Sequence, residues 1–253
     1  DLMFQANPVI NFLKNDKDQF RIFPADELSS NKFSYWNLES IGGYRPIKLR
    51  NYQDLMDAKG FSRPQILDML NVKYVLTRKK INNPNFMALK DVPGVFQNIN
   101  VLPKAWIVGN VKSVETQRES LMETLLNGFD PSNTAIIFKY QGESLKGMAS
   151  GQVDVISRTE NKINIMSQSE TGGMLVLSEI YYKPGWRAYV NGEETPVYQT
   201  NHILRSIYVP SGEHQIEFRY DDSSWKQTRI VSRVSFLAIL IGFGFILWKE
   251  KEN

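Results

Sequence analysis

The stretch RAYVNGEETPVY, residues 187–198, decides the fold class. Its centre is Asn191-Gly192, and the runs Arg187 to Val190 and Thr195 to Tyr198 flank it. Asn-Gly is the strongest short hairpin signal, because both central residues of a type I′ turn need a positive φ. The stretch therefore predicts a β-hairpin that turns at Asn191-Gly192.

On both sides of this hairpin, apolar residues recur with period two. Val153 and Val155 form one alternating pair, and a polar turn separates them from a second pair, Ile163 and Ile165. The run 214–220 alternates apolar and polar residues, so one face of a strand packs and the other meets water. Further strands are predicted over 174–180 and 203–209. Short strands at this spacing predict an antiparallel β-sandwich over residues 147–222.

Residues 1–146 mix helical and strand patterns. Apolar residues from Leu49 to Met56 recur at helical spacing and predict a helix that follows Pro46 and ends at Gly60. A second short helix is predicted from Pro64 to Leu70. Thr116 and Glu119 form a capping box, which predicts a third helix. Strands are predicted over 72–77 and 135–138. We therefore expect a small α+β unit over residues 1–146, ahead of the sandwich, so that the whole chain is of the α+β class.

Residues 223–253 are predicted to form a transmembrane helix with a short tail. Val234 to Trp248 contains no charged residue, and a start at Ile230 gives a span of nineteen residues. About 20 apolar residues cross a bilayer, and Arg233 lies near the end, where a long side chain reaches the headgroups. The alternative is a buried core helix. Because a large domain is translocated largely regardless of charge, we place residues 1 to about 225 outside the cytoplasm and the tail inside.

Composition excludes several classes of function. The chain has 30 Lys and Arg against 27 Asp and Glu, a net charge of +3, which does not indicate nucleic-acid binding. It has no cysteine, and its two histidines, His202 and His214, lack a third ligand at a useful spacing. We expect no metal, no cofactor and no catalytic residue. A chain that begins at Asp1 without a signal segment is expected to be part of a longer protein.

Two polar–aromatic clusters are candidate binding sites. The first comprises Gly42, Gly43, Tyr44 and Lys48, where paired glycines allow close approach of the backbone and a cation suits a phosphate or sugar phosphate. We expect Lys48 to lie in the first turn of a helix that starts near Pro46, where free N–H groups favour an anion. The alternative is a turn that leads into a helix with a solvated basic face.

The second cluster comprises Tyr182, Trp186, Asn201 and Arg205. Aromatic faces beside planar polar groups are typical of carbohydrate recognition. The alternative role for Trp186, which follows a Pro-Gly bend, is a plug in the core of the sandwich.

The chain also resembles a known family through an ordered set of motifs. The motifs are FRIFP (20–24), SIGGY (40–44), KLRNYQ (48–53), MLNVKY (69–74), PKAW (103–106), FDP (129–131), SEIYYKPGWRAYVNG (178–192), NHILR (201–205) and VPSGEH (209–214). Together they resemble the C-terminal part of the YfhO family of polytopic bacterial membrane proteins, particularly versions from Bacteroidetes.

The resemblance implies a glycosyltransferase architecture of the GT-C type, with a lipid-phosphate-linked sugar as donor and a cell-envelope glycan as acceptor. It places the catalytic carboxylate upstream of these residues, so that the fragment alone would be inactive. The full protein would be a multi-pass protein of the bacterial cytoplasmic membrane, with membrane lipid, a lipid-linked sugar and an envelope glycan as partners. The alternative is a non-catalytic, membrane-anchored envelope module that binds glycan or protein.

Overall fold

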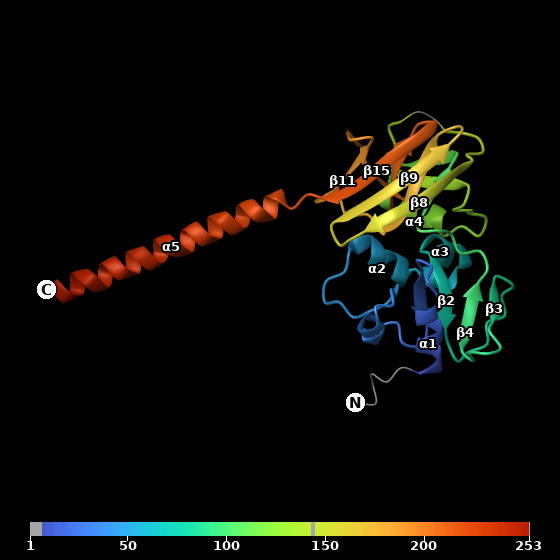
Figure 1. Ribbon diagram of the computed structural model, residues 1–253, viewed down its shortest axis with the longest axis horizontal. Coiled ribbons are helices and arrows are strands. Elements are labelled where there is room, and N and C mark those ends of the chain that lie inside the picture. Colours follow the sequence, from blue (N-terminus) through green and yellow to red (C-terminus); the bar gives the residue numbers. More distant parts are fainter. Residues whose placement is uncertain (1–6, 143–144, 253) are drawn as a thin grey trace.

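The computed structural model describes residues 7–142 and 145–252, apart from the side chains of residues 224, 245–247 and 250–252. The described chain forms a body of three sheets, from which one long helix projects (Figure 1). The mixed α+β class is confirmed.

The first sheet and its helices form the N-terminal part of the body. Its strand order is β1 (Arg21–Pro24), β2 (Val72–Leu76), β4 (Val95–Asn98) and β3 (Phe86–Ala88). The strands β1 and β2 are parallel, and the other pairs are antiparallel. The helical elements are α1 (Pro8–Asn15), η2 (Lys32–Trp36), α2 (Arg50–Asp57), η3 (Gly60–Ser62) and α3 (Pro64–Met69). The two helices predicted over this part of the chain are confirmed as α2 and α3.

The second sheet has six strands and occupies the middle of the body. Their order is β5 (Ala105–Val108), β10 (Gly173–Ile180), β14 (Leu204–Val209), β13 (Tyr198–Thr200), β7 (Thr134–Phe138) and β6 (Asn110–Val114). The helix α4 (Gln117–Thr124) connects β6 to β7 and begins with the predicted capping box. This sheet takes strands from both sides of the boundary expected between residues 146 and 147. The sequence could not show this shared sheet, because the sequence of a strand does not reveal which distant strand pairs with it.

The third sheet packs on the second and completes a sandwich. Its order is β12 (Glu193–Thr195), β11 (Trp186–Val190), β15 (Gly212–Tyr220), β9 (Lys162–Ser169) and β8 (Gly151–Arg158), all antiparallel. Asn191 and Gly192 have φ values of 52° and 89°, as the predicted hairpin requires. The sandwich is therefore confirmed, with the difference that β6 and β7 pair in parallel.

Three strands of the six-stranded sheet, β5, β7 and β10, are buried over most of their length, which explains their nearly continuous apolar sequences. In β10, Leu175 and Leu177 face the core of the sandwich, whereas Met174 and Val176 face a core that includes α2 and α3. Period two assigns successive residues to opposite faces, so a strand covered on both sides loses its polar positions. The middle sheet thus joins the sandwich to the N-terminal part.

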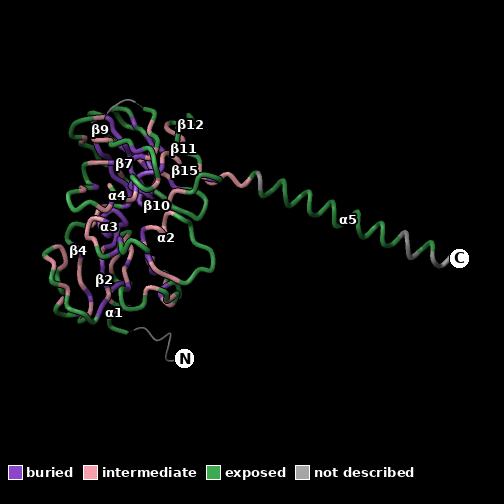
Figure 2. Tube along the Cα trace, turned by 180° about the vertical axis from the view of Figure 1, so that it is seen from behind, coloured by how far each residue is buried: buried purple, intermediate pink, exposed green. Residues whose placement is uncertain are grey.

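The helix α5 (Ser223–Glu252) is continuous, as predicted, and projects away from the body (Figures 1 and 2). Its described large apolar side chains are exposed, Phe236 at 63% and Ile239 at 68% among them, so it is not a buried core helix. Within the described residues, no helix is both long and apolar enough to cross a membrane. The span predicted over Ile230 to Trp248 includes residues 245–247, whose side chains lie outside the described set.

Candidate functional site

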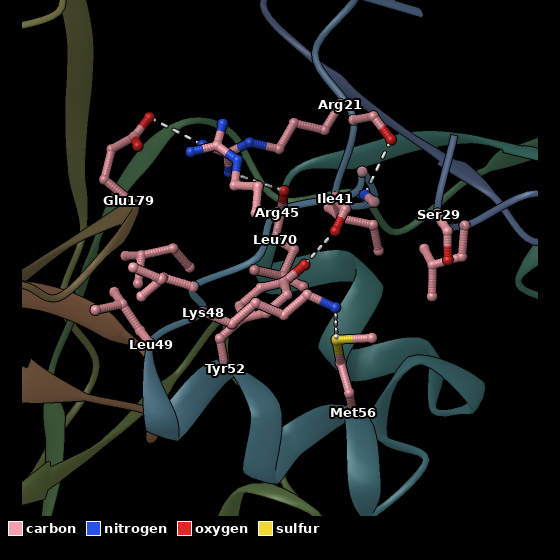
Figure 3. Close-up of a pocket in the computed structure, with 16 residues that line it drawn as sticks. Arg21, Ser29, Ile41, Arg45, Lys48, Leu49, Tyr52, Met56, Leu70 and Glu179 are labelled. Atoms are coloured by element: carbon pink, nitrogen blue, oxygen red, sulfur yellow. Dashed lines mark hydrogen bonds and ion pairs between the residues drawn. The ribbon is translucent and has the colours of Figure 1, made fainter. Parts of the chain in front are cut away.

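A cleft of about 410 Å³ lies where the loop before α2 meets the end of β10 (Figure 3). Its polar and charged lining includes Arg21, Ser40, Arg45, Lys48, Tyr52 and Glu179, and Gly42 and Gly43 form part of its wall. A neighbouring cavity of about 490 Å³ shares Arg21, Gly42, Gly43 and Arg45, and it adds Glu39 and Arg158. Side chains from the N-terminal part and from both sheets of the sandwich therefore meet here.

The structure brings three of the four residues of the first candidate cluster to this cleft. Gly42, Gly43 and Lys48 line it, whereas the side chain of Tyr44 does not. Tyr44 is 68% exposed, and its backbone is held by the side chain of Asn31, which accepts from Tyr44 N at 2.7 Å and donates to Tyr44 O at 3.1 Å.

The paired glycines allow a close approach within the chain itself. A Cβ on Gly42 would lie 2.3 Å from the carbonyl oxygen of Leu28. Gly43 has a φ of 129°, and its N–H donates to that same oxygen at 2.6 Å. Residues other than glycine rarely adopt that φ. These contacts fix the wall of the cleft against the segment around Leu28.

The helix that follows begins later than the sequence predicted. Leu49 is extended, with φ −64° and ψ 136°, and α2 begins at Arg50 rather than near Pro46. The prediction that Lys48 lies in the first helical turn is therefore wrong. Lys48 precedes the helix, and its Nζ lies 4.0 Å from Met56 Sδ (Figure 3). Arg50 pairs with Asp54 at 2.8 Å on the surface of the helix.

A cluster of five charged side chains adjoins the cleft, and local sequence patterns did not reveal it. Glu179 Oε1 lies 2.9 Å from Arg21 Nη2, 3.1 Å from Lys104 Nζ and 3.1 Å from Arg158 Nη2. Glu39 pairs with the same three cations. Arg21 lies within the apolar run Phe20-Arg21-Ile22, and Lys104 directly precedes the apolar run 105–108. A charge in such a run is the signal that could have indicated the cluster, because buried charges need partners.

The cluster keeps both carboxylates ionised. Burial by itself raises the pKa of Glu39, but Lys104, Arg21 and Arg158 lower it to about 2. The pKa of Glu179 is also lowered, because the attraction of the same cations outweighs burial. Burial lowers the pKa of Lys104, and the positive charge of Arg21 adds to this. Three basic side chains therefore face two ionised carboxylates.

The cleft adds two further cations to this excess of positive charge. Arg45 and Lys48 are exposed, and neither has an acidic partner among the described residues. An Arg guanidinium offers paired donors to a phosphate, and a Lys ammonium offers a point charge. The arrangement is therefore suited to binding an anionic group such as a phosphate.

The second candidate cluster does not form one open site. The guanidinium of Arg205 stacks on Trp186, 4.2 Å from the ring centroid, and its Nη2 donates to Ile180 O at 2.7 Å. Arg205 is 3% exposed, and burial lowers its pKa to about 10. Asn201 is fully buried and accepts from Ile136 N at 2.9 Å. Tyr182 is 39% exposed. Trp186 therefore packs as part of the sandwich.

The two histidines have separate surroundings. His202 is 1% exposed, with Nε2 4.0 Å from Asp54 Oδ2, and burial lowers its pKa. His214 lies on β15 beside Asn191. Over residues 7–142 and 145–252, no group of three or more metal-ligating side chains could hold a metal ion.

Comparison with known proteins associates the chain with a family. Residues 139–232 match the family described as bacterial membrane protein YfhO. We call this stretch, which is similar to that family, the YfhO segment. The YfhO segment contains β8 to β15 and the start of α5, and therefore Glu179, Trp186 and Arg205. No curated protein and no solved structure matches the chain. The YfhO resemblance is thus confirmed for this stretch, which supports a location at a bacterial membrane.

Proposed function

We propose that the chain is the extracytoplasmic C-terminal part, with the last membrane helix, of a polytopic glycosyltransferase of the GT-C type. The enzyme would transfer a sugar from a lipid-phosphate-linked donor to a cell-envelope glycan. The catalytic residue would lie upstream of this chain. In this proposal the chain holds the phosphate of the donor over a catalytic centre that other segments supply.

The observation that carries the proposal is the excess of positive charge at the cleft. Arg45 and Lys48 lack acidic partners among the described residues, and the cluster behind them holds three cations against two carboxylates. Cations in the lining of a cleft that no carboxylate neutralises are available to an anionic ligand. A lipid-linked sugar phosphate carries the complementary charge.

The helix α5 supports the membrane part of the proposal. It leaves the body as one helix, and its apolar side chains are exposed to solvent rather than packed. Trp225 and Trp248 stand near its two ends, as interfacial tryptophans do. The YfhO segment, whose family is described as bacterial membrane proteins, extends into this helix as far as residue 232.

The test is to replace Lys48 with Met in the full-length protein and to measure sugar transfer together with thermal stability. Lost transfer at unchanged stability supports the proposal, and full transfer removes Lys48 from the mechanism. Joint loss would return Lys48 to a structural role. Lys90→Met is a matched control, because Lys90 is also exposed but lies outside the cleft.

A second experiment separates the enzyme from a non-catalytic binding module. The upstream sequence should contain an acidic residue in the first outward loop, and its replacement by the amide should abolish transfer. Retention of envelope-glycan binding by a protein without any such residue would favour the module.

A further inference from the structure

We infer that the loop beside the cleft rests on the anionic headgroups of the membrane surface. We call residues 43–50 the rim loop. Ile47 is 87% exposed, Tyr44 68% and Leu49 40%. Three large apolar or aromatic side chains within six residues form an exposed patch that is rarely left in water without a partner.

Cations alternate with these apolar side chains. Arg45, Lys48 and Arg50 lie within the same loop, and of the three only Arg50 has an acidic partner among the described residues, Asp54. The apolar side chains alone would suit a protein partner, but the cations among them favour an anionic surface. Exposed apolar side chains interleaved with cations are typical of a segment that inserts at the headgroup level of an anionic bilayer.

The rim loop lies on the side of the body from which α5 projects (Figures 1 and 2). The connection between β10 and β11 links the two places. Ile180, at the end of β10, lines the cleft together with Ile47, and five residues later Gly185 O accepts from Asp221 N at 2.6 Å. Asp221 stands two residues before the start of α5.

The depth expected for the body relative to the bilayer is consistent with contact between the rim loop and the lipid headgroups. This step rests on the proposed function, in which α5 crosses the membrane from Ile230. The seven preceding residues of α5, Ser223 to Arg229, span about 10 Å at about 1.5 Å per residue. The headgroup layer is about 5–8 Å thick on each side. The surface around the start of α5 therefore lies near headgroup depth.

Site-specific labels test the inference, since the chain has no cysteine of its own. A fluorophore is attached to Ile47→Cys, Met148→Cys or Leu240→Cys in the full chain, which is reconstituted into vesicles of phosphatidylethanolamine and phosphatidylglycerol. Met148 is a matched control because it is 89% exposed. It also adjoins Ala149, which lies beside Gly173 at the opposite end of β10 from Ile180. That strand is about 23 Å long at about 3.3 Å per residue.

The expected result is quenching at position 47 by a nitroxide on the lipid headgroup, with position 148 quenched only by iodide from water and position 240 shielded within the bilayer. Replacing Arg45, which has no acidic partner among the described residues, by Gln should lower headgroup contact at position 47 by about fivefold, as expected for the loss of one cation at an anionic surface.

Three results would overturn the inference. A label at position 47 as open to iodide as the label at position 148, with position 240 shielded, would remove the rim loop from the membrane and leave the proposed function intact. Equal contact in vesicles of phosphatidylcholine alone would exclude recognition of anionic lipid. Loss of shielding at position 240 would overturn the membrane part of the proposed function together with this inference.

Discussion

The two polar–aromatic clusters look alike in the sequence but have opposite environments in the structure. Lys48 lines an open cleft and has no acidic partner among the described residues. Arg205 is buried, stacks on Trp186 and donates to Ile180 O. Both clusters join an aromatic residue to a cation near a Gly-containing bend. Composition alone therefore does not separate a ligand site from a packed core.

The two clusters differ in how far the fold buries their cations and in the partners that the fold gives those cations. Trp186 and Arg205 lie on neighbouring layers of the sandwich, so each covers the other. The rim loop is covered on one side only, where Gly42 and Gly43 contact the segment around Leu28. A cation that the fold covers becomes part of the core, and a cation that the fold leaves open can meet a ligand.

The largest expected effect is at Glu179, which lies between the two clusters. Glu179→Gln leaves Arg21, Lys104 and Arg158 with one carboxylate, and Lys104 is 5% exposed. Removing one partner of a buried ion pair is expected to cost about 4 kcal/mol. Chemical denaturation at neutral pH measures it. Glu194→Gln, in an exposed pair with Arg187, is the control and should cost less than about 1 kcal/mol.

Acid titration checks the same cluster. The pKa values of Glu39 and Glu179 are lower in the folded state than the ordinary value of 4.5, so the stability they contribute is present above about pH 4.5. It is lost as the pH falls toward about 2, the pKa of Glu39. The Glu179→Gln variant should lose less stability than the unchanged chain over this range. An identical loss would show that Glu179 does not titrate in the cluster.

The sequence predicted elements better than it predicted their partners. The hairpin at Asn191-Gly192 and the capping box at Thr116 depend on neighbouring residues, and both are confirmed. The start of α2 was misplaced because Leu49 is extended. Arg21 and Glu179 are 158 positions apart in the chain, so no local pattern could pair them. The pairing of distant strands in the middle sheet and the charged cluster therefore needed the structure.

Truncation of Trp186 tests whether the second cluster is a packed core. Trp186→Ala removes a ring that packs against Arg205 and against Tyr220, whose centroid is 5.8 Å away. We expect a loss of about 3 kcal/mol in the free energy of unfolding. Trp225→Ala is the matched control, since Trp225 is 68% exposed, and should cost less than about 0.5 kcal/mol. Unchanged stability in Trp186→Ala would show that the ring of Trp186 is not needed for packing and would favour its role in binding.

A smaller effect is expected at Gly42, in the wall of the cleft. Gly42→Ala would place a Cβ 2.3 Å from the carbonyl oxygen of Leu28, and the backbone must move to relieve the clash. We expect a loss of about 2 kcal/mol together with weaker anion binding. Gly128→Ala is the control, because a Cβ there meets nothing within 4 Å. Equal stability of the two variants would show that the backbone around Gly42 can move without loss of folding free energy.

The smallest effect on stability is expected at Lys48, and it makes the comparison sharpest. Lys48 is exposed, and its Nζ lies 4.0 Å from Met56 Sδ, so Lys48→Met should change the free energy of unfolding by less than about 0.5 kcal/mol. A lost charge-assisted hydrogen bond to phosphate is nevertheless expected to weaken binding of inorganic pyrophosphate about tenfold. Calorimetric titration of the full chain measures that affinity, with Lys90→Met as the control. Unchanged affinity in Lys48→Met would place the bound anion on Arg45 and Arg21 instead, whereas equal weakening in both variants would reduce the effect to net charge.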